Sequence, residues 1–325
     1  MSKKTVKKDL RCLMNFQYLY GPVPSRRLGR SLGVSPIPPK TCNFSCVYCQ
    51  LGRTSNMTNQ RQEFFNLQDI LEEFDAYVKN DVSQFDFVTI VGEGEPLLYS
   101  RIGELIKSIK AYVDKPVAVI TNGALLSEEK VRQELNESDL VMPTLDAYDQ
   151  RTFKRINRPH KSISFDSYVN GLISFSKNFK GKIWMEFMMV KGLNDDEESL
   201  RKIKEIFNKI SYDKLYINLP MRPPAENWVT VPEKERIELA QNTLGGISLD
   251  FLEEEDFYSS IEDDLEAILS IIKRHPMNQH EIESFLNQRK CENKNEIFEK
   301  LEKEENVEKV QYFGLNVYRL TSVRR

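Results

Sequence analysis

The sequence has no apolar run long enough to cross a membrane. A spanning helix needs about 20 consecutive apolar residues, and the most hydrophobic stretch, residues 183–190, is short and contains Glu186. The N-terminal segment MSKKTVKKDLRCLMNF is basic and lacks the apolar core of a signal peptide. We therefore expect a cytoplasmic protein with no membrane contact.

A strong net charge is also absent. The 46 Lys and Arg residues nearly balance the 49 Asp and Glu residues, which leaves a formal charge of −3. A basic field over the whole molecule, of the kind that gathers nucleic acid, is therefore excluded. With 40% hydrophobic residues and only 14 Gly and 14 Pro in 325 residues, the chain has the composition of a globular protein of roughly two domains.

Cysteine and histidine are scarce, with five Cys and three His. An odd number of cysteines, three of them between positions 42 and 49, does not make a disulfide framework. The crowding instead indicates a metal site in a reducing compartment.

Short apolar runs alternate with amphipathic helical patterns along most of the chain. The predicted strands are 32–36, 85–91, 117–121, 140–145, 183–190 and 215–219. The predicted helices are 67–79, 102–112, 127–135, 165–179 and 197–210. Five successive β-α-β crossovers predict an α/β fold with a parallel sheet covered by helices. Six units are fewer than the eight of a closed barrel, so we predict an open (β/α)6 partial TIM-like barrel.

The pattern changes after residues 245 and 246. A last strand over 247–252 and an acidic run over 253–256 precede a helix over 261–273, helical patterns over 279–286 and 295–303, and a hairpin over 307–312 and 316–320. This is the element order of a winged helix-turn-helix. We predict an N-terminal extension (1–20), a core domain (21–255) and a winged-helix-like module (256–325).

The three crowded cysteines are Cys42, Cys46 and Cys49. Clustered thiolates select zinc or iron–sulfur clusters. A structural zinc site needs a fourth ligand, and the other cysteines and the histidines are distant in sequence. The alternative is a cubane cluster with three irons held by the protein and one iron left open.

The spacing Cys-x3-Cys-x2-Cys, with Tyr48 before the last cysteine, resembles the signature of the radical S-adenosylmethionine (radical SAM) superfamily. The longer stretch 21–54 resembles a branch of uncharacterised Fe–S oxidoreductases related to wybutosine-type enzymes, and the resemblance extends to about residue 235. It implies that the three cysteines bind a [4Fe–4S] cluster whose open iron binds SAM. Reductive cleavage of SAM would then produce a 5′-deoxyadenosyl radical that abstracts hydrogen from a substrate. The electron would come from an external donor of the flavodoxin or ferredoxin type.

Polar motifs follow the predicted strands, where ligands of barrel-like α/β folds gather. The cysteine loop follows the first strand, and the motifs after the next five strands are 92–96, 121–123, 144–146, 191–194 and 220–224. We therefore expect one active-site face at these strand ends.

The resemblance also implies roles for individual residues. Gly94 and Glu95 match the element that binds the SAM amino group, although Glu93 stands where the family has its first glycine. Asn122, Thr144 and Asp146 resemble residues that reach the SAM ribose or carboxylate. Capping and turn formation would equally account for these three.

Three further residues are candidates for cofactor contact. Tyr48 is expected beside the adenine. Glu186 and Asn218 lie inside apolar strands, where a carboxylate is costly unless it is paired. They are expected to contact SAM or substrate, or to satisfy one another. Arg26, Arg27 and Arg30 are candidate anion contacts or solvated surface residues.

The C-terminal module supports a second hypothesis, a non-catalytic metal- or redox-sensing regulator that binds DNA. Against it, acidic residues outnumber basic ones over 294–305, the candidate recognition segment. We expect instead that the module docks or presents a substrate, which the sequence leaves open as RNA, peptide or small molecule. The sequence carries no prediction of the oligomeric state.

Overall fold

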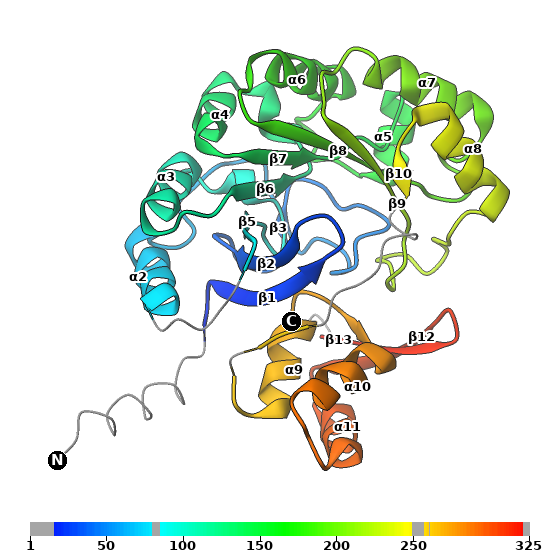
Figure 1. Cartoon of the computed structure of the whole chain (residues 1–325). Coiled ribbons are helices and arrows are strands. Elements are labelled where there is room, and N and C mark those ends of the chain that lie inside the picture. Colours follow the sequence, from blue (N-terminus) through cyan, green and yellow to red (C-terminus); the bar gives the residue numbers. More distant parts are fainter. Residues whose placement is uncertain (1–15, 80–84, 249–256, 260, 321–325) are drawn as a thin grey trace.

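The computed structural model describes residues 16–79, 85–248, 257–259 and 261–320. Its main feature is an eight-stranded open sheet in the order β1-β2-β5-β6-β7-β8-β9-β10, covered by helices along its outer side (Figure 1). The strands are β1 (Leu19–Ser25), β2 (Gly29–Val34), β5 (Phe87–Ile90), β6 (Val117–Thr121), β7 (Leu140–Pro143), β8 (Lys182–Met188), β9 (Lys214–Asn218) and β10 (Ile247–Ser248). The α/β prediction is confirmed, and the open sheet is consistent with a partial barrel.

The six predicted strands correspond to β2 and β5–β9, which pair in parallel with their neighbours. The expected last strand is present as β10, parallel to β9. The rest of that prediction and the acidic run lie in 249–256, outside the described residues. Parallel pairing aligns the carboxyl ends of these strands on one edge of the sheet.

The prediction of an all-parallel sheet is wrong at its N-terminal edge. β1 pairs antiparallel with β2, so the sheet is mixed. The sequence analysis missed β1 because the strand contains Pro22 and Pro24, which have no N–H group to donate to the hydrogen bonds of a sheet. Prolines are tolerated there because β1 is an edge strand.

The helices of this part are α2 (Leu67–Lys79), α3 (Ile102–Tyr112), α4 (Glu129–Glu134), α5 (Gln150–Ile156), α6 (Phe165–Asn178), α7 (Glu197–Phe207) and α8 (Lys234–Leu244). Their apolar faces pack on the sheet, as when α7 buries Leu200, Ile203 and Phe207. The predicted helix 127–135 is shorter, because 3-10 turns at Ala124–Ser127 and Leu135–Glu137 flank α4. The sequence analysis missed α5 and α8, in which few residues are apolar and the 3.6-residue pattern is weak.

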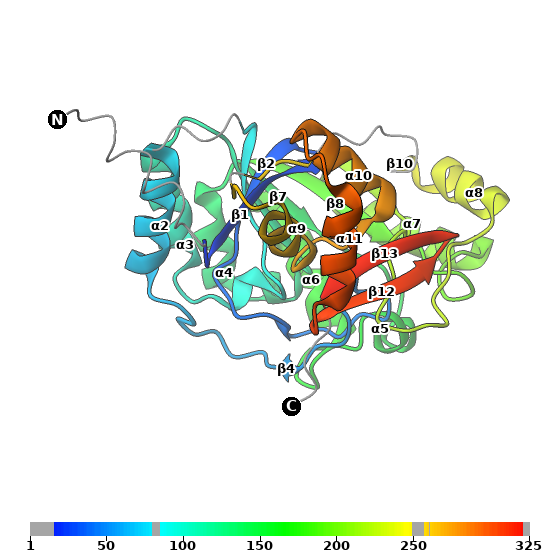
Figure 2. The ribbon, with the colours of Figure 1, turned by 90° about the horizontal axis from the view of Figure 1, so that it is seen from below.

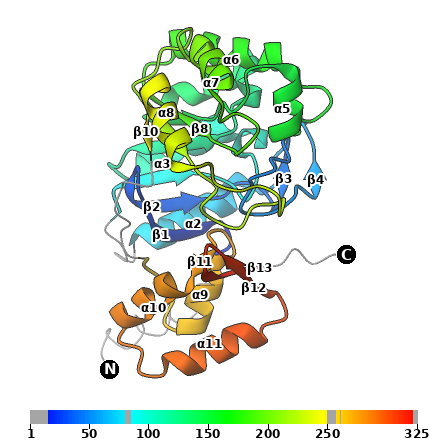
Figure 3. The same ribbon diagram turned by 90° about the vertical axis from the view of Figure 1, so that its right-hand side faces the viewer.

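The C-terminal elements are α9 (Asp264–Ile272), β11 (Met277–Asn278), α10 (Gln279–Gln288), α11 (Lys294–Lys303), β12 (Val307–Tyr312) and β13 (Leu315–Leu320). They enclose a second hydrophobic cluster and form a sheet of order β11-β13-β12. These elements lie below the core, across the open side of its sheet (Figures 2 and 3). Val23 of β1 packs against their cluster.

No helix in the described part of the chain is both long and apolar enough to span a membrane.

Candidate functional site

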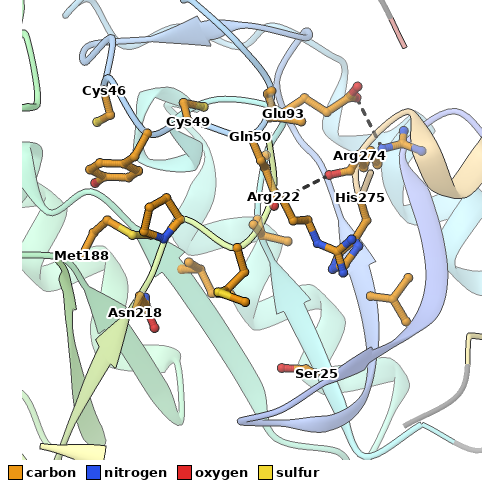
Figure 4. A pocket seen from close by; sticks show the side chains of 18 of the residues that line it. Ser25, Cys46, Cys49, Gln50, Glu93, Met188, Asn218, Arg222, Arg274 and His275 are labelled. Carbon is orange, nitrogen blue, oxygen red and sulfur yellow. Dashed lines mark hydrogen bonds and ion pairs between the residues drawn. The ribbon is translucent and has the colours of Figure 1, made fainter. Parts of the chain in front are cut away.

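A cavity of about 650 Å³ opens at the carboxyl ends of the parallel strands, between the core and the C-terminal elements (Figure 4). Its lining includes most of the predicted site residues: Cys42, Cys46, Tyr48, Cys49, Gly94, Glu95, Asn122, Thr144 and Asn218. Segments far apart in the sequence thus meet around one space. These residues therefore line one cavity at the strand ends, and their roles stay a prediction.

One predicted motif does not contribute to this lining. The loop 191–194, all of which the structure describes, contributes no residue to the cavity. Asn194 is buried and uses its amide to hold backbone groups, donating to Asp146 O at 2.8 Å and to Met188 O at 2.9 Å. The loop 191–194 therefore stabilises the end of β8 through these hydrogen bonds.

Asp146 is also absent from the lining of the cavity and is 1% exposed. Its carboxylate accepts hydrogen bonds from Tyr48 Oη at 2.5 Å, Asn157 Nδ2 at 2.7 Å and Met188 N at 2.8 Å. Burial raises the pKa of this carboxyl to about 6, while the three donors act in the opposite direction. Asp146 therefore holds Tyr48 in place by a hydrogen bond, and Tyr48 lines the cavity.

Glu186 lies within β8, outside the lining, and forms a buried ion pair with Arg27. The alternative that Glu186 and Asn218 satisfy one another is wrong, because Arg27 supplies the charge that a buried carboxylate needs. Asn218 lines the cavity, and its Oδ1 is buried without a hydrogen-bond partner within the described structure.

The cysteine loop begins at β3 (Thr41–Cys42), which pairs with β4 (Asn56–Met57). Backbone turns then bring the cysteines together: Cys49 N donates to Cys46 O at 3.2 Å, and Gly52 N donates to Cys49 O at 3.0 Å. All three thiols consequently line the same cavity.

Hydrogen-bond donors surround the thiols. Cys42 Sγ lies 3.4 Å from Phe44 N and 3.7 Å from Asn122 Nδ2, and Cys46 Sγ lies 3.6 Å from Asn157 Nδ2. Burial raises the pKa values of the free thiols, whereas a bound metal deprotonates its thiol ligands. N–H donors aimed at sulfur stabilise the thiolate form that a metal cluster requires.

The loop 92–96 packs tightly against the cysteine loop. A Cβ built on Gly94 would lie 1.9 Å from Thr41 O, so only glycine fits this close approach. Two backbone bonds join the loops, from Lys40 N to Glu93 O at 2.6 Å and from Glu95 N to Thr41 O at 3.1 Å. The two predicted motifs are therefore one structural unit.

Glu95 is 2% exposed and accepts three hydrogen bonds. The donors are Thr121 Oγ1 at 2.6 Å, Asn122 N at 2.8 Å and Leu97 N at 3.0 Å. Burial raises the pKa of its carboxyl to about 7. The donors fix the orientation of the Glu95 carboxylate. Among the residues that the structure describes, none of its hydrogen-bond partners is a cationic side chain, which suits it to a cationic ligand group.

The donor set fits an iron–sulfur cluster. Among the described residues, no group of three or more Cys, His, Asp or Glu side chains converges on the position of a single metal ion. A cubane cluster does not require convergence on one point, because each thiolate binds a different iron. Three thiols on one loop, with N–H donors beside two of them, match this requirement.

A model of the Radical SAM superfamily matches residues 37–203. The chain belongs to this superfamily. UPF0026 protein MJ1312 of Methanocaldococcus jannaschii is 35% identical over 92% of this chain and 94% of its own length. A protein named GTPase Obg from Brachyspira hyodysenteriae is 40% identical over 69% of this chain, and the match covers 33% of that protein.

Among solved structures, TYW1 with a lysine-pyruvate adduct bound has the same core fold. It has a TM-score of 0.53 and 20% identity, over 66% of this chain and 72% of its own. Radical SAM proteins use a [4Fe–4S] cluster and SAM, so the predicted cofactors and the assignment as a radical SAM enzyme are confirmed.

The sequence analysis missed the part of the site that the C-terminal elements supply. Arg274 forms an ion pair with Glu93 at 3.3 Å, and its carbonyl accepts from Gln50 Nε2 at 3.5 Å (Figure 4). Arg222, after β9, forms an ion pair with Glu281 of α10 at 2.8 Å. The available signal was Glu93, a charged residue in a position where the family has glycine.

Proposed function

We propose that Cys42, Cys46 and Cys49 hold the [4Fe–4S] cluster of a radical SAM enzyme. The observation that carries this proposal is that the three thiols line one cavity together with the loop 92–96. When bound, the cluster would supply a single electron for the reductive cleavage of SAM, and the resulting 5′-deoxyadenosyl radical would abstract hydrogen from the substrate.

The chain's own residues would bind and orient SAM. Glu95 is suited to the ammonium group, because it is a buried carboxylate held by three neutral donors. Tyr48, Asn122, Thr144 and Asn218 line the same cavity and are proposed to contact the rest of SAM. We assign Asp146 and Glu186 to positioning, because neither residue lines the cavity and their carboxylates contact Tyr48 and Arg27 instead.

We further propose that residues 256–325 are a winged-helix-like module that completes the substrate chamber, with the core domain spanning 21–255 and the first 20 residues forming an extension. Support comes from the element order and the separate hydrophobic cluster. The module supplies part of the cavity wall through Phe257, Arg274, His275, Asn278, Glu281, Tyr312 and Phe313.

The cavity limits the form of the substrate. A volume of about 650 Å³ is of the size that holds small-molecule ligands. SAM would fill much of it. We infer that the substrate enters as a small molecule or as one residue of a peptide or RNA, presented by the module.

A DNA-binding regulator is not favoured. Two ion pairs lie within α11, with Lys300 Nζ at 2.7 Å from Glu296 and Lys303 Nζ at 4.0 Å from Glu299. The other charged residues of the helix, Lys294 and Glu302, contact Asn287 and Lys309. Such a helix presents no net positive face to a phosphate-lined groove.

Cytoplasmic location and an external one-electron donor of the flavodoxin or ferredoxin type belong to the same proposal. Thiols that bind a cluster must remain reduced, which favours the cytoplasm.

Anaerobic reconstitution tests the function. We expect about four irons per chain and 5′-deoxyadenosine that forms only with SAM and a reductant. Replacing Cys42, Cys46 or Cys49 with Ala should abolish both, whereas Cys291→Ala, at a partly exposed cysteine of the module, should retain them. Stoichiometric zinc without iron, or no 5′-deoxyadenosine from an iron-loaded protein, would contradict the proposal.

A further inference from the structure

The segment 150–161, which contains α5, is strongly basic. It carries five Lys or Arg residues and no Asp or Glu, in a chain whose formal charge is −3. Four of the basic residues are exposed: Arg151, Lys154, Arg155 and Lys161. We call these four residues the α5 patch.

The α5 patch is not neutralised by neighbouring carboxylates. Arg158, the fifth basic residue of the segment, forms an ion pair with the buried Glu226. Within the described part of the chain, none of the four patch residues makes an ion pair. Arg151, Lys154 and Arg155 are spaced three and four residues apart, so they share the solvent face of α5. A concentrated positive surface of this kind attracts an acidic partner.

The segment that carries the patch packs against the cysteine loop, and Figure 3 shows α5 near β3 and β4. Backbone hydrogen bonds join the segment to the loop: Ser45 N donates to both Asn157 O at 3.0 Å and Arg158 O at 3.2 Å, Val47 N donates to Ile156 O at 2.9 Å, and His160 N donates to Asn43 O at 2.7 Å. Asn157 also places its Nδ2 3.6 Å from Cys46 Sγ. A short chain of contacts therefore runs from the patch to a cluster ligand.

The patch does not belong to the substrate cavity. None of residues 150–161, all of which the structure describes, lines that cavity. The cysteine loop thus has the cavity on one side and the basic segment against its backbone. A partner on this segment would approach the cluster without blocking the path of the substrate.

We propose that the α5 patch is the docking surface for a small acidic electron-carrier protein that reduces the cluster. This inference rests on the proposed function, which requires one electron for each SAM that is cleaved. Outside the loop, the described part of the chain has one cysteine, Cys291, so it offers no second cluster to relay the electron. One electron leaves the carrier, which is oxidised by one unit, and enters the cluster, which is reduced by one unit; no proton or atom is transferred.

RNA is the other class of partner that a basic surface attracts. It is less favoured, because a substrate must place its reacting group in the cavity that the patch does not line. Binding of RNA is therefore kept as an outcome of the test.

The test compares two triple variants of the reconstituted full-length protein. The first is Arg151→Glu, Lys154→Glu and Arg155→Glu. The matched control is Lys177→Glu, Lys180→Glu and Lys209→Glu, which makes the same change in net charge at exposed lysines elsewhere. Stopped-flow absorbance follows cluster reduction by a fully reduced flavodoxin at low and high salt. SAM cleavage with dithionite at high salt serves as the measure of intact chemistry.

We expect the patch variant to lose at least tenfold in the second-order rate of reduction by flavodoxin at low salt, with a weaker salt dependence than the wild type. The control variant should keep the wild-type rate within about twofold, and both variants should cleave SAM normally with dithionite. Equal losses in both variants, or an unchanged rate in the patch variant, would overturn the proposal. Loss of binding to an RNA oligonucleotide with unchanged reduction by flavodoxin would reassign the patch to nucleic acid. Failure of the wild-type protein to cleave SAM with dithionite would instead refute the proposed function.

Discussion

The ion pair between Arg274 and Glu93 can be tested for its role in attaching the C-terminal elements to the core. Both side chains are almost fully buried, with exposed fractions of 6% and 7%, and Nε of Arg274 lies 3.3 Å from Oε2 of Glu93. The perturbation is Glu93→Gln, which keeps the size of the side chain and removes its charge. Arg274→Met and the double variant complete a cycle.

The structure sets the expected magnitude. Removing one partner of a buried pair leaves an uncompensated charge and costs about 3–5 kcal/mol. In Glu93→Gln the guanidinium keeps a hydrogen bond to Gln17 O at 3.0 Å and stacks over Tyr20 at 4.7 Å. We therefore expect a loss at the lower end, about 3 kcal/mol. The double variant, which buries no charge, should be less destabilised than the sum of the two single variants by at least about 1.5 kcal/mol.

The assay must detect separation of the C-terminal elements as well as global unfolding. Urea titration with hydrogen exchange of α9 and α10 amides measures both, and the single variants should increase exchange there first. The exposed pair Arg201–Glu205 on α7 is the control, and its cycle should show little coupling. Additivity of the Glu93 and Arg274 variants within about 0.5 kcal/mol would refute the reasoning.

Three further predictions concern the residues around the cysteines. Because a SAM ammonium group prefers ionised Glu95, and the pKa of that carboxyl is about 7, SAM affinity should rise about fivefold from pH 6 to pH 7, below the range in which an α-amino group loses its own proton. Calorimetry should find this rise absent in Glu95→Gln, and a rise that persists would exclude the assignment. Gly94→Ala should destabilise the protein by roughly 1–3 kcal/mol and reduce its iron content, because the new Cβ would overlap Thr41 O. An iron content equal to that of the wild type would show that the loop 92–96 can move away from the cysteine loop. Asn157→Leu removes the N–H group that donates to Cys46 Sγ. The midpoint potential of the cluster, measured by a redox titration followed by EPR, should fall while the iron content stays the same. An unchanged potential would show that Asn157 only supports the backbone.

The glutamate at position 93 illustrates how a departure from a family motif acquires a reason in the fold. By sequence alone it leaves the contacts of the SAM amino group in doubt. In the structure its side chain points to Arg274 while its carbonyl accepts from Lys40 N (Figure 4). The same loop therefore carries Glu95, which we propose to contact SAM, and Glu93, which contacts the C-terminal elements. A change in the position of the C-terminal elements would therefore move the loop 92–96 through the contact between Arg274 and Glu93.

Local patterns determined most of the helices and strands. Amphipathic spacing placed α2 and α3 at their observed bounds, and apolar runs placed β6 at Val117–Thr121. These elements were predictable because one buried face repeats every 3.6 residues or forms a short continuous run. β1 and α5 were missed because their stability comes from neighbours, an edge pairing for β1 and packing against the cysteine loop for α5.

The sequence by itself determined the chemistry of this protein, because three closely spaced thiols and an aromatic residue constitute a local motif that needs no knowledge of distant contacts. It also indicated that the strand ends would share a face, since parallel pairing aligns them. Only the tertiary structure decided which polar residues reach the cavity and which are already satisfied, as with Asp146 held by Tyr48 and Glu186 held by Arg27. It alone brought Arg274 to Glu93 and the basic segment to the cysteine loop. The residues of these pairs lie up to 181 positions apart in the sequence (274 − 93). Packing and charge in the folded chain select partners at such separations, and a local sequence pattern cannot predict them.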